Sequence, residues 1–163
     1  MNHEFHDIEI VDFHDEWASD FASLNYEWIE KFFAVEKHDR EILDDPRKFV
    51  VDPGGQIFMA VAASRAAGTV AMIPAGDGVM ELTKMAVSPA FQGHGIGGKL
   101  MARCVEYARE MRIKTIFLES HTKLAPAISL YRKHGFVEVP GDPHSLYVRA
   151  DIRMELAIPS SSM

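Results

Sequence analysis

The chain is poor in cysteine, in long apolar runs, in positive charge and in clustered metal ligands. Cys104 is the only cysteine among 163 residues, which excludes an intrachain disulfide and, with an acidic N-terminus unlike a signal peptide, predicts a cytoplasmic location. No apolar run approaches the ~20 residues of a membrane span, so we expect no membrane association. The net charge of −7 argues against nucleic acid as the main partner. The eight histidines show no tight spacing with Cys or another His, so we expect no metal site.

The length and the hydrophobic fraction of 47% fit one domain with a sizeable core. We place this single domain at residues 1–158. The remaining residues, 159–163, read Pro-Ser-Ser-Ser-Met and are expected to form a short flexible tail.

Hydrophobic periodicity divides the chain into alternating strands and helices. Strands are expected at 8–13, 57–63, 68–73, 79–87, 115–119, 136–139 and 146–155, and helices at 15–33, 36–44, from 95 to about 111, and around 124–131. The order β-α-α-β-β-β-α-β-α-β-β predicts an α/β fold, termed α+β in some schemes, with a mixed central sheet and helices on both faces.

A glycine-rich turn follows the strand at 79–87 and opens the next helix. It reads Gln-Gly-His-Gly-Ile-Gly-Gly over residues 92–98. Glycine lets the backbone approach a ligand closely and adopt positive φ, while the free N–H groups and the dipole of the helix favour negative charge. The turn therefore predicts a phosphate-binding site.

Two nucleotide motifs fit these letters. The stretch from Gly93 to Gly98 satisfies G-x-G-x-x-G, and Glu119 follows at about the distance of a ribose-binding acid. However, an intervening segment separates Val87 from the first glycine, where a dinucleotide site needs a turn directly after the strand. The stretch also satisfies G-x-x-x-x-G-K, but Leu100 stands where a nucleotide triphosphatase needs a hydroxyl for magnesium. The dinucleotide interpretation stays open as the weaker one.

A third pattern, Gln-x-x-Gly-x-Gly, begins at Gln92, and a second segment at 127–136 reads Ala-Ile-Ser-Leu-Tyr-Arg-Lys-His-Gly-Phe. Together, in this order and with a strand between them, these segments resemble the GNAT superfamily of N-acetyltransferases, which hold acetyl-CoA. The resemblance is firm over residues 79–139, and the family's order of elements matches the predicted one. One departure is Leu124, because many members carry there an asparagine that contacts the cofactor arm.

The resemblance implies how acetyl-CoA is bound. In the family the strands at 79–87 and 115–119 splay apart, and the pantetheine arm lies between them as if it were an added strand. Pantetheine amides would pair with the backbone of the first strand, and N–H groups of the turn would hold the pyrophosphate. The implied cofactor-binding residues are Met85, Ala86, Val87, Gln92, Gly93, His94, Gly95, Ile96, Gly97 and Gly98.

Catalysis of amine acetylation calls for a base, a donor to the departing thiolate and an N–H for the oxyanion. Glu81 matches a catalytic glutamate of the histone-acetylating branch, and strict alternation places it on one face with Thr83, Met85 and Val87. Its alternative role is a structural strand glutamate. His121 is a second candidate base, or else an exposed loop residue. Tyr131 holds the family's acid position, or is a core aromatic.

The acceptor is expected to face the segment between the first two strands. Trp28 and Phe32 fit the buried stripe of the helix in this segment. Other side chains of the segment can face the cleft, where an aromatic ring and a carboxylate would bind an ammonium. These substrate candidates are Tyr26, Glu30, Phe33, His38 and Asp39, together with His121. A cationic acceptor is therefore expected, with a solvated face as the alternative.

The sequence thus predicts an N-acetyltransferase that moves the acetyl group of acetyl-CoA to a primary amine, on a small molecule or a protein, by direct attack in a ternary complex. The alternative is a non-catalytic acyl-CoA-binding sensor or regulatory module of the same fold. Glu81 and Tyr131 favour catalysis, since a binding module needs neither. A monomer or a homodimer is expected.

Overall fold

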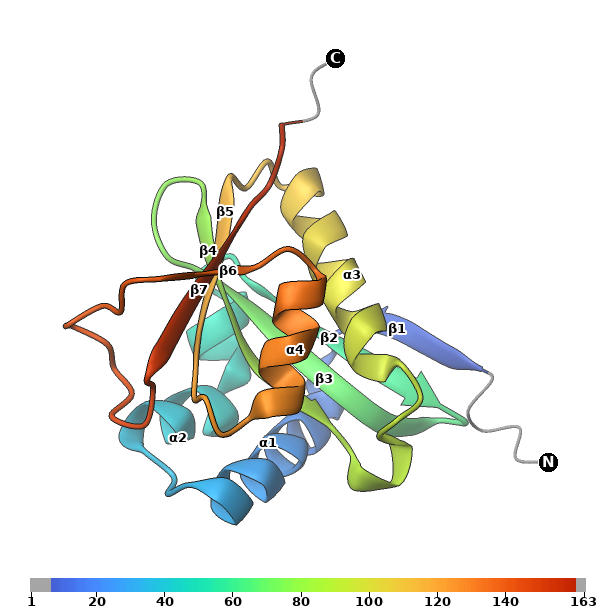
Figure 1. The fold of residues 1–163 in the computed structure, drawn as a ribbon. Coiled ribbons are helices and arrows are strands. Elements are labelled where there is room, and N and C mark those ends of the chain that lie inside the picture. Colours follow the sequence, from blue (N-terminus) through green and yellow to red (C-terminus); the bar gives the residue numbers. More distant parts are fainter. Residues whose placement is uncertain (1–6, 161–163) are drawn as a thin grey trace.

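The computed structural model describes residues 7–160, which build one seven-stranded sheet with the strand order β1-β2-β3-β4-β5-β7-β6 (Figure 1). The strands are β1 (Ile8–Asp12), β2 (Gln56–Ala62), β3 (Arg65–Pro74), β4 (Val79–Val87), β5 (Thr115–Ser120), β6 (Val137–Val139) and β7 (Ile152–Ala157), and the helices are α1 (Ala18–Phe32), α2 (Lys37–Asp44), α3 (Ile96–Glu110) and α4 (Ala125–Lys133). β4 and β5 pair in parallel and the other neighbours are antiparallel. The predicted fold class is confirmed.

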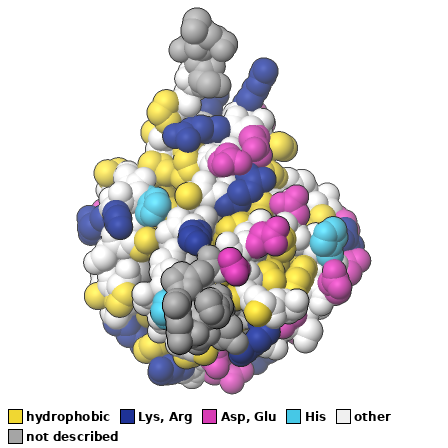
Figure 2. All heavy atoms as spheres, turned by 90° about the vertical axis from the view of Figure 1, so that its right-hand side faces the viewer, with side chains coloured by type: hydrophobic (Ala, Val, Ile, Leu, Met, Phe, Trp, Pro, Cys, Tyr) yellow, Lys and Arg dark blue, Asp and Glu magenta, His cyan; other side chains and the backbone are white. Residues whose placement is uncertain are grey.

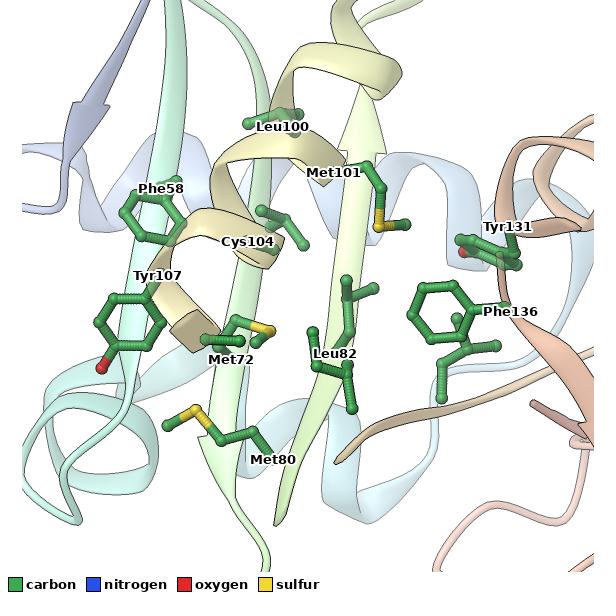
Figure 3. Close-up of a cluster of buried hydrophobic side chains, with 14 of the residues drawn as sticks. Phe58, Met72, Met80, Leu82, Leu100, Met101, Cys104, Tyr107, Tyr131 and Phe136 are labelled. Atoms are coloured by element: carbon green, nitrogen blue, oxygen red, sulfur yellow. The ribbon is translucent and has the colours of Figure 1, made fainter. Parts of the chain in front are cut away.

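Helices cover both faces of the sheet (Figure 1). On one face, α3 and α4 pack on a core that includes Met72, Leu82 and Leu118 (Figure 3). On the other, α1 and α2 enclose a second cluster around Phe21 and Ile42. Both clusters exist because successive side chains of a strand point to opposite faces.

Several boundaries differ from the sequence prediction. A 3-10 turn at Asp15–Trp17 precedes α1, and a π-helical turn at Arg47–Val51, which no sequence pattern indicated, leads into β2. The predicted strand at 146–155 is wrong in its first half, because the chain forms a loop until β7 begins. Leu146 and Val148 are 66% and 95% exposed there, so their apolar alternation does not mark a buried strand face.

An extra residue in β4 opens the sheet. Between the pairs Ala71↔Thr83 and Thr69↔Ala86, β4 contains one residue more than β3 does. This extra residue forms a β-bulge. At the bulge Lys84 has φ 56°, a left-handed conformation uncommon for a residue other than glycine. The parallel β4–β5 ladder ends nearby, at Glu81↔Phe117, although both strands continue. The two strands therefore part beyond this pair, as the family resemblance implied.

Two general features of residues 7–160 complete the description. None of their helices is both long enough and apolar enough to cross a bilayer. On the face drawn in Figure 2, the basic and acidic side chains lie interspersed among hydrophobic ones.

Candidate active site

A cavity of about 200 Å³ lies where β4 and β5 diverge. We call the space between residues 82–87 of β4 and 118–120 of β5 the slot. The cavity continues from the slot to α1, α4 and the loop at 140–151, whose side chains complete its wall: Trp28, Phe32, Phe33, His121, Leu124, Ala127, Tyr131, Tyr147, Arg149 and Ala150. Five distant parts of the chain therefore meet here.

The predicted cofactor strand forms one wall of the slot. Met85, Ala86, Val87 and the following Gln92 all line the cavity. The Ser88 N–H bonds to the Ala67 carbonyl on β3, and because N–H directions alternate along a strand, the N–H of Val87 points toward the slot. It is thus available to a pantetheine amide or to an oxyanion.

The glycine turn has the backbone that its sequence predicted. Gly93 and Gly95 have φ of 83° and 76°, and Gly95 is the N-cap of α3. A Cβ at either position would meet nothing within 4 Å, so conformation rather than crowding requires glycine. The first N–H groups of α3, from Ile96 onward, have no partner within the helix. Residues 93–98 lie outside the cavity wall and follow it through Gln92, whose Nε2 donates to the Val87 carbonyl at 3.2 Å.

The bulge corrects the expectation that Glu81, Thr83, Met85 and Val87 share a face. Met85 and Val87 pack against the cluster beneath α3 and α4, whereas the side chain of Lys84 reaches α2 on the other face. One extra residue reverses the alternation, because the side-chain period of a strand is two.

Tyr131 comes from α4 and lies beside Phe136, with ring centroids 6.0 Å apart (Figure 3). It is nearly buried yet lines the cavity. No hydrogen bond to its hydroxyl is present among residues 7–160, and no fully enclosed side-chain oxygen in that range lacks a partner. The hydroxyl therefore borders the open cavity. Burial raises the pKa of Tyr131 to about 12, which keeps it protonated as a hydrogen-bond donor.

Glu81 lies at the last β4–β5 pair, next to the cavity rather than in its wall. Burial raises its pKa to about 7, and the charge of Glu119 adds to this rise. The charges of Lys84 and, to a smaller extent, Arg153 oppose it. A carboxyl group with this pKa exchanges its proton near neutral pH, as a general base requires. Leu82 packs in the same cluster as Tyr131, so the neighbouring Glu81 faces the opposite side of the sheet.

A buried ionic cluster lies on the acceptor side of the cavity, and the sequence did not indicate it. The Asp39 carboxylate accepts two hydrogen bonds of 2.7 Å from the Arg149 guanidinium and one of 2.8 Å from Lys84 Nζ. Lys84 Nζ also donates to the Tyr147 hydroxyl at 2.8 Å. Burial alone would raise the pKa of Asp39, but its hydrogen bonds to Arg149 and the charge of Lys84 hold that pKa well below its usual range.

The structure brings only two of the predicted substrate residues, Phe33 and His121, to the cavity. Tyr26 instead donates to Asp44 at 2.6 Å, and Glu30 is exposed. His38 pairs with Glu41 and packs on the Tyr147 ring, and Asp39 is fully buried behind its two cations. The expectation that Glu30 and Asp39 bind an ammonium is therefore wrong. The Glu30 carboxylate faces solvent, and the Asp39 carboxylate is already neutralised by its two cations.

Two aromatic residues assigned to the buried stripe of α1 line the cavity instead. Trp28 and Phe32 both contribute to its wall, and Phe32 is 43% exposed. Helical spacing alone does not distinguish a core stripe from one that turns into a cavity at the end of the helix.

His121 has both ring nitrogens occupied. Its Nδ1 accepts from the Lys123 N–H at 3.0 Å, so the neutral ring carries its hydrogen on Nε2, which lies 3.3 Å from Asp151 Oδ2. In this arrangement the ring offers no lone pair to a substrate proton, which favours Glu81 as the base.

The chain is similar in sequence or in fold to several known acetyltransferases. An uncharacterized N-acetyltransferase of Schizosaccharomyces pombe is 26% identical over 121 residues, which cover 72% of this chain and 74% of that protein. A GNAT acetyltransferase from Staphylococcus aureus has a TM-score of 0.85 at 18% identity, covering 94% of this chain and all of the other. The spermidine N-acetyltransferase of Vibrio cholerae, solved with CoA and spermine, has a TM-score of 0.71 at 19% identity, covering 94% and 96%.

The two structural likenesses establish the shared fold. The sequence model of the acetyltransferase (GNAT) family matches residues 3–136, most of the chain and all of β1 to α4. The chain belongs to the GNAT family of acetyltransferases.

Proposed function

We propose that this protein transfers the acetyl group of acetyl-CoA to a primary amine within a ternary complex. The observation that carries the proposal is the slot, with the backbone N–H of Val87 directed into it, the glycine turn beyond Gln92, Tyr131 in the cavity wall and Glu81 next to it. An extended thioester cofactor fits this shape, since its amides can hydrogen-bond to the backbone of β4 and its pyrophosphate can bind at the N-terminus of α3. A structural neighbour solved with CoA supports the choice of donor.

The reaction begins with the acceptor amine, whose usual pKa of ~10.4 makes its protonated form dominant at pH 7. Leaving this uncorrected costs ~4 to 5 kcal/mol of barrier, which a base can offset. Glu81 takes one proton of the ammonium, directly or through a water molecule, and the neutral nitrogen then attacks the thioester carbon. The N–H of Val87 stabilises the oxyanion of the tetrahedral intermediate.

The intermediate collapses when the carbon–sulfur bond breaks and leaves CoA as a thiolate. Tyr131 donates a hydrogen bond to the sulfur. With its pKa at about 12 against ~8.5 for a thiol, complete proton transfer from Tyr131 would be uphill by roughly 5 kcal/mol. Its contribution is therefore stabilisation of the developing charge. The acceptor nitrogen loses two protons in all: the first, taken by Glu81 before attack, leaves to solvent, and Glu81 then takes the second as the amide forms.

Calorimetric titration with acetyl-CoA and with NADH tests the assignment. We expect acetyl-CoA to bind more tightly, and we expect Gly95→Asp to abolish its binding through like charge beside the pyrophosphate and strain at positive φ. Gly76→Asp is the matched control, because Gly76 also has positive φ and open space around it but lies in the β3–β4 turn. Tighter binding of NADH, or unchanged binding in Gly95→Asp, overturns the cofactor assignment.

Turnover is tested separately by measuring thiol release from acetyl-CoA with a panel of amines. Tight acetyl-CoA binding without release for any amine would identify a non-catalytic acyl-CoA-binding module.

A further inference from the structure

On the acceptor side of the cavity two cationic side chains line the wall, and the carboxylate that neutralises them is buried behind them. Lys84 and Arg149 line the cavity, whereas Asp39, which binds both, is 0% exposed and lies behind them. The two Asp39 oxygens are occupied by these side chains and by the Glu36 N–H. A ligand in the cavity therefore meets N–H donors and not the carboxylate.

The two cations keep donor capacity for a ligand. An ammonium has three N–H groups and a guanidinium has five. Within residues 7–160, Lys84 Nζ makes two hydrogen bonds, to Asp39 and Tyr147, and the Arg149 guanidinium makes three, to Asp39 and Glu36. An anionic group in the cavity could thus accept from both side chains without displacing Asp39.

Aromatic rings surround the guanidinium of Arg149. Its central carbon lies 5.9, 5.6 and 4.8 Å from the ring centroids of Trp28, Phe33 and Tyr147, all of which line the cavity. Rings in this arrangement bind a cation, and here the protein supplies that cation itself. At the rim, Lys123 Nζ lies 4.1 Å from the Phe33 centroid and adds a further positive charge.

The opposite charge gathers where β4 and β5 part. Glu119 lines the cavity, and it lies close enough to Glu81 for its charge to raise the pKa of Glu81. Carboxyl groups therefore lie where β4 and β5 part, Lys84 lies between them and Asp39, and Arg149 lies further toward the loop at 140–151. A ligand with an amine at one end and an anionic group at the other complements this arrangement.

We propose that the acceptor is a primary amine that also carries a carboxylate. Its amine faces Glu81 and Glu119, its carboxylate faces Lys84 and Arg149, and an apolar or aromatic substituent packs on Trp28. The proposal rests on the proposed transfer reaction and replaces the cationic acceptor expected from the sequence.

Matched pairs of acceptors test it in the wild-type protein. Thiol release from acetyl-CoA is measured with phenylalanine, leucine and methionine, with the three amines that lack only the carboxylate, and with 1,4-diaminobutane. We expect at least one amino acid to exceed its decarboxylated partner by about tenfold or more in kcat/KM, the scale of a lost charge-assisted hydrogen bond. Turnover of the simple amines or the diamine with equal or higher kcat/KM overturns the proposal while leaving the acetyltransferase intact. Failure of all amines despite acetyl-CoA binding overturns the proposed function itself.

Variants of Arg149 locate the carboxylate. We expect Arg149→Gln to raise the KM of the preferred amino acid by about tenfold or more and to leave the KM of its decarboxylated partner within a few-fold, with Arg149→Lys between wild type and Arg149→Gln. Arg109→Gln, at an exposed position on α3, controls for the loss of one positive charge. Calorimetry with acetyl-CoA shows whether each variant is folded, and if Arg149→Gln fails this check, Arg149→Lys takes its place. Equal changes in the KM of both partners would assign Arg149 a structural role and overturn its contact with the acceptor.

Discussion

Glu81 connects stability and catalysis with opposite signs. Burial raises its pKa from 4.5 to about 7, so the native state binds this proton more tightly than the unfolded chain does. A carboxyl group of this kind stabilises the fold fully below about pH 4.5, and this contribution is lost as the pH rises through 7. The ionised base that the proposed reaction needs is therefore also a cost to the native state at working pH.

The size of this cost follows from the two pKa values. At 1.36 kcal/mol per pH unit, the difference between 4.5 and about 7 gives about 3 kcal/mol above pH 8, a ceiling because solvent reaches part of the side chain. Glutamine has nearly the same shape and cannot ionise. We therefore expect Glu81→Gln to be more stable than wild type at pH 8 by up to this amount, although its turnover falls by about 10² to 10⁴.

Urea unfolding at pH 5 and pH 8 measures the first effect, and steady-state thiol release across the same range measures the second. The stability of Glu81→Gln relative to wild type should grow by about 2 kcal/mol between the two pH values. Glu27→Gln, at an exposed position of α1, should show no such growth. A stability difference that is the same at both pH values, with a rate profile parallel to wild type, would refute both the raised pKa and the role as a base.

Three further changes test other parts of the site. Tyr131→Phe should lower kcat and leave acetyl-CoA affinity within a few-fold, because the hydroxyl acts on charge that exists only during reaction; a matching loss of stability and activity in denaturation and rate assays would point to packing alone. Asp39→Asn should cost about 3 to 5 kcal/mol in urea unfolding, since it leaves Lys84 and Arg149 buried without a full counter-charge; a loss under about 1 kcal/mol would contradict this. Cys104 is fully buried and burial raises the pKa of its thiol, so a maleimide should label it only in denaturant; labelling of the native protein at the rate of an exposed thiol would contradict the packing of α3.

Local sequence predicted the parts of this molecule that depend on local chemistry. Gly93 and Gly95 adopt positive φ at the start of a helix, as the spacing of the glycines indicated. Tyr131 packs in the core, one of the two alternatives named from the sequence, and it also lines the cavity. In each case residues within one or two turns of the chain determine the outcome.

The acceptor side could not be predicted, because it depends on pairs of residues far apart in the sequence. Lys84 and Asp39 are separated by 45 positions and Arg149 and Asp39 by 110. A lysine in the middle of a strand normally marks a solvent-facing position, but helices cover both faces of this sheet, and the bulge directs this lysine to the α2 face. Likewise, Leu146 and Val148 resemble a strand by alternation although it is Tyr147 between them that is buried.

The bulge at Lys84 accounts for both halves of the site. Parallel pairing stops at Glu81, just before the extra residue, so the backbone of Met85 and Val87 is left for a ligand and not for β5. The same extra residue directs the Lys84 ammonium toward Asp39 of α2. There the ammonium helps to hold the buried ionic cluster in place. Because Glu81 and Tyr131 lie on opposite faces, a continuous sheet would keep base and donor apart. The proposed chemistry therefore requires an opening between β4 and β5, and the left-handed Lys84 lies at the bulge beside this opening, where both proposed binding surfaces meet.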